Sequence, residues 1–288
     1  MTLIAGFPYA GGILLCSDTE HSGPEQKLFR TKISVTQCAL GTVGMAYVGN
    51  STLARSAMLK CERQLKELSG SGSLVDIVSE VLEREYREKI LGVASRAEDV
   101  NYWYDFLIAI ASDHDGLGFY CTDNETLHKW PTFKCRGSWE VPAEFVMKSL
   151  YWPGIELKDI LMSATYLLAR AKQNGTGIGG PSRFTAIRSD GTTDECDWWY
   201  AKPYEEALQQ FDWAFSRLLH GLMDETVKGS DFESVLLEVR ARMLNMKAAC
   251  LPSSEIEAVM NALIRSSAAQ LDLESTERGP SNPPPSQG

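Results

Sequence analysis

Thr2 follows Met1 directly, and removal of Met1 would leave a threonine that carries both a hydroxyl and a free α-amine. A threonine hydroxyl is a weak nucleophile near neutral pH and needs a nearby base, and an N-terminal amine can serve as that base. The α-amino pKa of about 7.7 to 8.0 suits this task. Met-Thr is also an ordinary way for a chain to begin, so the prediction depends on the residues that follow.

The next residues supply strands, a carboxylate and an amine. Apolar runs at 2–7 and 13–17 flank a Pro-Tyr-Ala-Gly-Gly turn and predict a hairpin that would hold Thr2 in place. Asp18 ends the second run, and Lys32 lies in a strand-forming stretch. A carboxylate keeps a neighbouring ammonium charged, and that ammonium lowers the pKa of a nearby hydroxyl or amine. Alone, Asp18 would be a carboxylate that caps a strand end and Lys32 an exposed strand lysine; together with Thr2 they predict a reactive group.

Gly49 closes a further apolar run at 41–49 and precedes Asn50, a predicted N-cap for a helix at 50–68. A glycine at this position suits the turn from strand to helix.

These residues, in this order and spacing, resemble the N-terminal half of a proteasome β-type subunit, a member of the N-terminal-nucleophile (Ntn) hydrolase superfamily, in the manner of a bacterial proteasome-like protein. The similarity covers residues 2–70 well and 100–195 more loosely, and it rests on Thr2, Gly11-Gly12, Asp18, Gly23, Lys32 and Gly49. It implies an α+β fold of the four-layer αββα sandwich type. It also implies a threonine-type peptidase or amidohydrolase that acts after removal of Met1.

The resemblance assigns roles residue by residue. Thr2 would be the nucleophile, with Asp18 and Lys32 as its supports and the N–H of Gly49 as the oxyanion donor. Ser138, in an Arg-Gly-Ser sequence before a predicted helix, matches the serine that hydrogen-bonds the N-terminal threonine in the family.

Substrate contacts and partners also follow from the resemblance. Ser22 and Tyr47 would contact a peptide or amide substrate, and Tyr47 implies a small or shallow pocket. The family assembles as a ring, so we expect a homo-oligomeric ring, and an ATPase partner is left open.

Two positions depart from the family pattern. Many active β subunits carry an aspartate shortly before Gly179-Gly180, where this chain has Asn174 and Thr176, neither of which can supply a carboxylate. Glu20 stands where the family often has arginine. Two alternatives to a peptidase therefore stay open: a non-catalytic structural subunit and an Ntn amidohydrolase of small molecules.

Composition narrows the function classes. The formal net charge of −10, from 38 acidic and 28 basic residues, argues against a nucleic-acid or anionic membrane partner. The longest apolar run is far shorter than the roughly 18 to 20 residues of a membrane span. We expect a soluble, cytoplasmic protein. The seven cysteines and four histidines form no metal-ligand spacing, and no phosphate-binding loop occurs, so we expect no metal and no cofactor.

The chain divides into a predicted Ntn-hydrolase domain at 1–199, a helical extension at 200–270 and a disordered tail at 271–288. Helical periodicity in the first domain falls at 74–92, 140–151 and 156–173, and a strand hairpin at 106–112 and 117–122. In the extension, helical periodicity falls at 204–223, 231–248 and 253–270. We predict that these helices pack onto the sandwich rather than form a separate recognition module.

Overall fold

The computed structural model describes residues 2–22, 27–68, 71–92, 103–196, 198–223 and 229–249. The strands are β1 (Leu3–Tyr9), β2 (Gly12–Ser17), β3 (Glu20–Ser22), β4 (Lys27–Phe29), β5 (Ile33–Cys38), β6 (Gly41–Gly49), β7 (Tyr104–Ser112), β8 (Gly116–Asp123), β9 (Thr126–Lys129), β10 (Lys134–Gly137), β11 (Arg183–Arg188) and β12 (Thr193–Cys196). The helices are α1 (Ser51–Lys66), α2 (Leu74–Tyr86), η1 (Arg87–Leu91), α4 (Glu140–Lys148), α5 (Leu157–Asn174), α6 (Trp198–Met223) and α7 (Gly229–Ala249).

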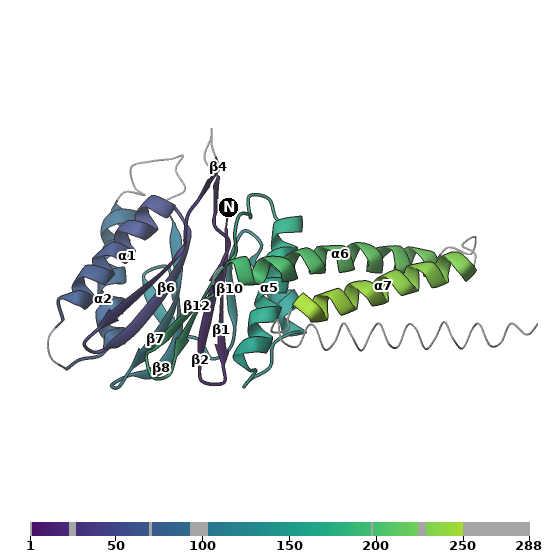
Figure 1. The fold of residues 1–288 in the computed structure, drawn as a ribbon. Helices are drawn as coiled ribbons and strands as arrows, with labels where there is room; N and C mark the ends of the chain where they lie inside the picture. The colour runs from purple at the N-terminus through teal and green to yellow at the C-terminus, as the bar shows by residue number, and fades with distance from the viewer. Residues whose placement is uncertain are drawn as a thin grey trace, which may run out of the picture. The chain divides into compact units, whose positions relative to one another are not determined.

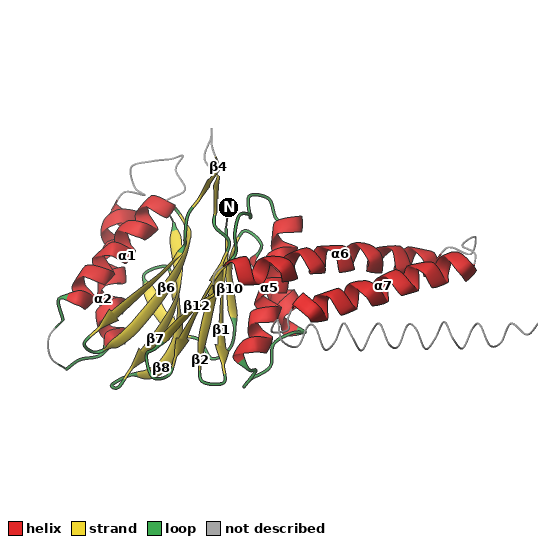
Figure 2. Ribbon diagram, in the orientation of Figure 1, coloured by secondary structure: helices red, strands yellow, loops and turns green. Residues whose placement is uncertain are grey.

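The strands form antiparallel sheets (Figure 2). One five-stranded sheet has the order β10-β1-β2-β11-β12, and a second has the order β5-β6-β7-β8-β9. The predicted N-terminal hairpin is confirmed, since β1 pairs with β2 in a register that places Ile4 opposite Ser17. The predicted hairpin at 106–122 is confirmed as β7 and β8.

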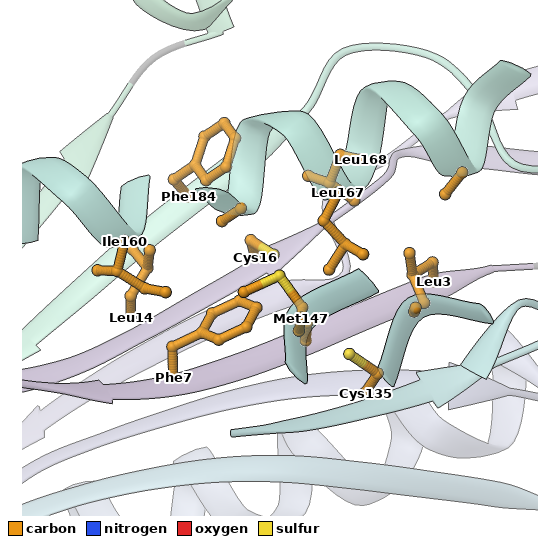
Figure 3. Close-up of a cluster of buried hydrophobic side chains, with 14 of the residues drawn as sticks. Leu3, Phe7, Leu14, Cys16, Cys135, Met147, Ile160, Leu167, Leu168 and Phe184 are labelled. Carbon is orange, nitrogen blue, oxygen red and sulfur yellow. The ribbon is translucent and has the colours of Figure 1, made fainter. Parts of the chain in front are cut away.

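The first sheet buries one face against helices α4 and α5. Figure 1 labels α5 and the strands β1, β2 and β10 of this sheet. Alternate residues of a strand point to opposite faces. Leu3 and Phe7 of β1 therefore share one apolar cluster with Leu167 of α5 and Met147 of α4, as Figure 3 shows. The side chain of Ile4, which follows Leu3 in β1, points to the opposite face and belongs to another cluster.

Two further clusters, one of which contains Ile4, complete the core of this part of the chain. One joins β6 and β7 to the apolar stripes of α1 and α2, with Met45, Ala57 and Val78 buried in it. The other joins side chains of both five-stranded sheets, among them Ile4 of β1 and Leu107 of β7. These clusters hold the start of β1, and with it Thr2, against well-packed strands.

Helix ends follow local signals. Asn50 caps α1 through its side-chain oxygen, which accepts hydrogen bonds from the N–H groups of Thr52 and Leu53. Ser73 caps α2 in the same way through Asp76. The single helix predicted at 74–92 is α-helical only to Tyr86 and continues as the π-helix η1.

The predicted four-layer αββα sandwich is wrong as a description of this fold. The described residues form an α+β fold with three antiparallel sheets and six α-helices. The third sheet is the pair β3-β4, in which Glu20 lies opposite Phe29. The polar segment Glu20–Ser22 is a strand because its backbone groups pair with β4.

The chain divides by its contacts into two compact units, Met1–Glu205 and Glu206–Gly288. In the second unit, α6 and α7 share a small apolar cluster around Ala214, Leu218 and Val239. The predicted domain limits at 199 and 270 stay predictions. The third predicted helix at 253–270 and the tail at 271–288 lie outside the described residues. In the part of the chain that the structure describes, no helix is long and apolar enough to cross a membrane.

Candidate functional site

Thr2 lies at the start of β1, where β10 fixes its backbone. The N–H of Ser138 donates to the carbonyl oxygen of Thr2 at 3.1 Å, and Gly137 lies opposite Leu3 in the sheet. Gly137 has φ +127°, and a Cβ atom there would overlap the carbonyl oxygen of Thr2. Only glycine therefore lets β10 approach this closely.

Asp18 follows β2 and is fully buried. Its Oδ1 accepts the N–H of Leu3 at 3.0 Å, and its Oδ2 accepts the N–H groups of Glu20 at 3.1 Å and Gly179 at 3.3 Å. These backbone donors come from three separate segments. They hold the carboxylate in one orientation and compensate part of the cost of burying it.

Lys32 immediately precedes β5 and is also fully buried. Its Nζ lies 2.6 Å from Thr2 Oγ1, 2.8 Å from Asp18 Oδ1 and 2.8 Å from the carbonyl oxygen of Glu20. A lysine ammonium has three N–H donors, and each has an acceptor here. The sequence predicted that Thr2, Asp18 and Lys32 would meet, and the structure brings them together.

Burial shifts the titration of both charged groups. Desolvation lowers the pKa of Lys32, and the charge and hydrogen bond of Asp18 oppose that shift. Desolvation raises the pKa of Asp18, and the charge of Lys32 opposes it. Both shifts disfavour the charged forms, as expected for groups withdrawn from water. An amine with a lowered pKa is better able to exchange a proton near neutral pH.

Gly49 ends β6, directly before the cap of α1. It has φ +95°, and a Cβ atom there would overlap the carbonyl oxygen of Trp103. The backbone thus requires glycine at this turn, and its role as an oxyanion donor stays a prediction. Ser138 is exposed, and its contact with Thr2 is made by its backbone N–H. The predicted hydrogen bond from the Ser138 hydroxyl stays a prediction.

Tyr47 is buried on β6 and lines a cavity of about 150 Å³. The other lining residues are Thr31, Ile33, Ser34, Arg55, Met58, Leu59 and Glu62. Thr31 and Ile33 flank Lys32 in the chain, but neither Lys32 nor Thr2 lines the cavity. The side chain of Ser22, the other predicted substrate contact, lies outside the described residues.

His21, on β3, has its Nε2 3.5 Å from the hydroxyl oxygen of Tyr47. Burial lowers the pKa of His21 to about 4, with smaller contributions from the charges of Lys32, Arg30 and Arg55. The ring is therefore neutral at physiological pH.

The segment 175–182, between α5 and β11, reaches the site through its backbone. Besides the Gly179 N–H on Asp18, the Gly179 carbonyl oxygen accepts the N–H groups of Thr19 at 3.1 Å and Glu20 at 2.9 Å. The Thr19 hydroxyl donates to the carbonyl oxygen of Pro181 at 2.9 Å.

The side chain of Asn174 binds the backbone of its own helix. Its Nδ2 donates to the carbonyl oxygen of Arg170 at 2.9 Å at the end of α5. A buried carboxylate does reach this region from another strand: Glu20 is 6 % exposed, and a Cβ atom on Gly179 would overlap its Oε2. The charge of Glu20 also favours the charged form of Lys32.

Sequence reasoning missed several of these contributions. The carbonyl of Glu20 and the N–H of Gly179 act through the backbone, which side-chain types do not reveal. The hydrogen bond from the Ser34 hydroxyl to Glu62 in the cavity joins β5 to α1 and had no signal in either segment. No cluster of three or more metal-ligating side chains occurs among the described residues.

Comparisons with known proteins bear on the fold. The sequence matches no protein-family model, and a search of curated proteins finds no match. Solved structures do match: Anbu (ancestral beta-subunit) from Yersinia bercovieri has 12 % identity and a TM-score of 0.62, and the match covers 79 % of this chain and 99 % of that chain. The Anbu complex from Pseudomonas aeruginosa, described as a helical assembly, has 12 % identity, a TM-score of 0.64 and the same two coverages. Anbu from Hyphomicrobium sp. strain MC1 has 11 % identity and a TM-score of 0.60, over 78 % of this chain and 98 % of that chain.

These matches correct the resemblance drawn from the sequence. The similar structures are Anbu proteins, described as ancestral β-subunits, so the identification as a proteasome β-type subunit of the Ntn superfamily is wrong. The motif residues on which the resemblance rested lie between positions 2 and 49, whereas the structural match extends over 79 % of the chain. At 11 to 12 % identity the likeness shows a proteasome-like Anbu fold.

Proposed function

We propose that this protein is a threonine-type amide hydrolase that uses Thr2 as its nucleophile once Met1 has been removed. The observation that carries the proposal is the 2.6 Å separation of Lys32 Nζ from Thr2 Oγ1, with Lys32 itself held by the buried Asp18. A buried lysine that places one of its three donors on a threonine hydroxyl favours the alkoxide character which attack on a carbonyl requires.

The proposed reaction balances with the groups present and one water. The freed α-amine of Thr2 takes the hydroxyl proton while Oγ1 bonds to the substrate carbonyl carbon, and the ammonium of Lys32 stabilises negative charge on Oγ1. The carbonyl oxygen becomes an oxyanion, for which the N–H of Gly49 is the proposed donor. Collapse breaks the C–N bond, and the amine leaves with the proton from the Thr2 ammonium. Water then hydrolyses the ester on Thr2.

The cavity beside Tyr47 is the proposed binding place for a substrate side chain. Its volume of about 150 Å³ suits a small or medium side chain, in keeping with the shallow pocket expected from Tyr47. A Tyr47→Ala variant should enlarge the cavity and shift preference toward larger side chains. An unchanged preference across a panel of peptide amides would contradict this assignment.

Covalent labelling tests the proposed nucleophile. We expect the purified full-length protein to have the N-terminal mass that corresponds to loss of Met1, and we expect a β-lactone probe to add its mass at Thr2. A Thr2→Ala variant should not be labelled, whereas a Thr126→Ala variant, which removes an exposed threonine hydroxyl on β9, should be labelled as the wild type. Retention of Met1, or equal labelling of the Thr2→Ala variant, would contradict the proposal.

A second candidate is a non-catalytic structural subunit. The observation in its favour is the commitment of the Asn174 amide to Arg170, which leaves the end of α5 without a carboxylate for Thr2. This candidate predicts a protein that does not react at Thr2 but forms a defined oligomer by light scattering. The related Pseudomonas aeruginosa structure is a helical assembly, which supports an oligomer here; the ring and the ATPase partner stay predictions.

A further inference from the structure

A second, largely buried polar cluster is formed by Lys172 of α5, Ser182 and Glu205 of α6. Lys172 Nζ lies 2.8 Å from Ser182 Oγ and 2.8 and 3.1 Å from the two carboxylate oxygens of Glu205. The Ser182 hydroxyl also donates to Glu205 Oε1. Ser182 is fully buried, and the side chains of Lys172 and Glu205 are 14 % and 10 % exposed.

The cluster clamps both ends of one loop. Lys172 lies in the last turn of α5, and Ser182 directly precedes β11, so their hydrogen bond closes the segment between them. Glu205 binds both residues and thereby fixes the two ends to the same carboxylate. Hydrogen bonds between charged partners are stronger than those between neutral ones, and burial protects these from water.

The clamped loop needs such a restraint because of its composition. Residues 175–182 include four glycines, and Gly177 and Gly180 have φ +69° and +73°. Glycine has the largest conformational freedom to lose on ordering, so a glycine-rich loop takes up one conformation only when other contacts impose it. The middle of this loop presents the Gly179 N–H to Asp18 at 3.3 Å.

We propose that Glu205 is a positioning residue of the Thr2 site, which acts through Lys172 and Ser182 to hold the 175–182 loop so that Gly179 orients the Asp18 carboxylate. The chain of contacts runs from Glu205 to Lys172 and Ser182 at the ends of the loop, and from Gly179 at its middle to Asp18. Asp18 in turn holds Lys32. The consequence for catalysis rests on the proposed function of Thr2, whereas the consequence for the loop does not.

Amide hydrogen exchange of the full chain tests the loop. Glu205→Leu removes both the charge and the hydrogen-bond acceptors, and Glu205→Gln keeps a neutral group of the same shape. We expect the Gly179 N–H to exchange about 10 to 100 times faster in Glu205→Leu, since a hydrogen bond to a charged group contributes roughly this factor to a local equilibrium, with Glu205→Gln between it and the wild type. Glu80→Gln, a matched change at an exposed glutamate of α2, should leave Gly179 unchanged.

A second variant keeps the test decisive if Glu205→Leu does not fold. Ser182→Ala leaves the Lys172–Glu205 ion pair in place and removes only the hydroxyl, so it should accelerate Gly179 exchange by a smaller factor. Wild-type exchange at Gly179 in folded Glu205→Gln and Ser182→Ala proteins would overturn the proposal.

The kinetics of β-lactone labelling separate positioning from general stability. We expect Glu205→Gln to lower the maximal labelling rate of Thr2 on the order of tenfold while the concentration of probe at half-maximal rate stays constant, because the probe binds away from the cluster. A change confined to that concentration would overturn the positioning role. Failure of the wild type to react would instead refute the proposed function, and the exchange result would still decide whether Glu205 holds the loop.

Discussion

The buried pair of Lys32 and Asp18 makes a prediction that depends on geometry alone. Their side chains are fully buried, with 2.8 Å between Nζ and Oδ1. At an effective dielectric constant of about 20, Coulomb's law gives about 6 kcal/mol of attraction at this distance, and this is an upper limit because desolvation opposes it. Removing one partner of a buried pair costs about 3 to 5 kcal/mol, since the other charge is left without compensation.

The perturbation is a double-mutant cycle with Lys32→Met, Asp18→Asn and the two together. Each single change should lower the free energy of unfolding by about 3 to 5 kcal/mol at pH 7. The double variant leaves no buried charge in the pair, so its cost should fall short of the sum by about 2 to 4 kcal/mol. The exposed pair of Arg188 and Asp194 serves as a control, with an expected coupling below about 1 kcal/mol.

The two single variants should respond to pH in opposite directions. In Lys32→Met, burial raises the pKa of Asp18 and no cation opposes the shift. The stability that this carboxyl group contributes is therefore fully present below its ordinary pKa and is lost as the pH rises through the raised value. In Asp18→Asn, burial lowers the pKa of Lys32 without an opposing anion. Stability is then present above the amine's ordinary pKa and is lost as pH falls through the lowered value.

Urea unfolding, followed by tryptophan fluorescence at pH 5, 7 and 9, measures both effects. From pH 5 to 9 the stability of Lys32→Met relative to the wild type should fall, and that of Asp18→Asn should rise. If the single costs add to within about 0.5 kcal/mol in the double variant, or if both slopes have the same sign, the two groups do not form a buried ion pair and the reasoning is refuted.

Three further predictions concern the surroundings of this pair. Gly137→Ala should destabilise the protein by roughly 2 to 6 kcal/mol and lower labelling at Thr2, because it combines backbone strain with an overlap on the Thr2 carbonyl oxygen. Gly116→Ala, at φ +68° with open space around it, should cost only about 1 to 2 kcal/mol. Equal urea midpoints for the two variants would contradict this. Asn50→Ala should cost about 1 kcal/mol in the same assay through loss of the α1 cap, and no change in midpoint would argue against that cap. Burial lowers the pKa of His21 to about 4. The stability that its neutral ring contributes is therefore fully present above about pH 6.5, the ordinary pKa of histidine, and is lost as the pH falls through about 4. An NMR titration of the ring with a midpoint near pH 6.5 would contradict this prediction.

Much of the secondary structure could be predicted from periodicity. The hairpin of β1 and β2, the pair β7 and β8, and the helices α1, α4 and α5 lie where apolar spacing placed them, because each buries one face on its own local pattern. The strands β3 and β4 could not be predicted in this way. Each is only three residues long, which is too short to show an alternating pattern, and only their pairing with each other makes them strands.

For the candidate site, the order and spacing of Thr2, Asp18 and Lys32, together with the resemblance that they supported, singled these residues out. The sequence also showed correctly that no aspartate stands at Asn174 or Thr176. It could not show what takes up that region, since the contacts there come from backbone groups of Gly179 and from Glu20, on a strand far away in the chain.

The sequence by itself thus determined which side chains are available for chemistry and where the longer helices and strands lie. Only the tertiary structure decided that Lys32 directs its three donors to Thr2, Asp18 and the Glu20 carbonyl, and that Glu205 binds both ends of the loop that reaches Asp18. The physical reason is distance, because hydrogen bonds act over only about 3 Å. The packing of two sheets and their helices brings groups that are 10 to 161 residues apart in the chain within that range.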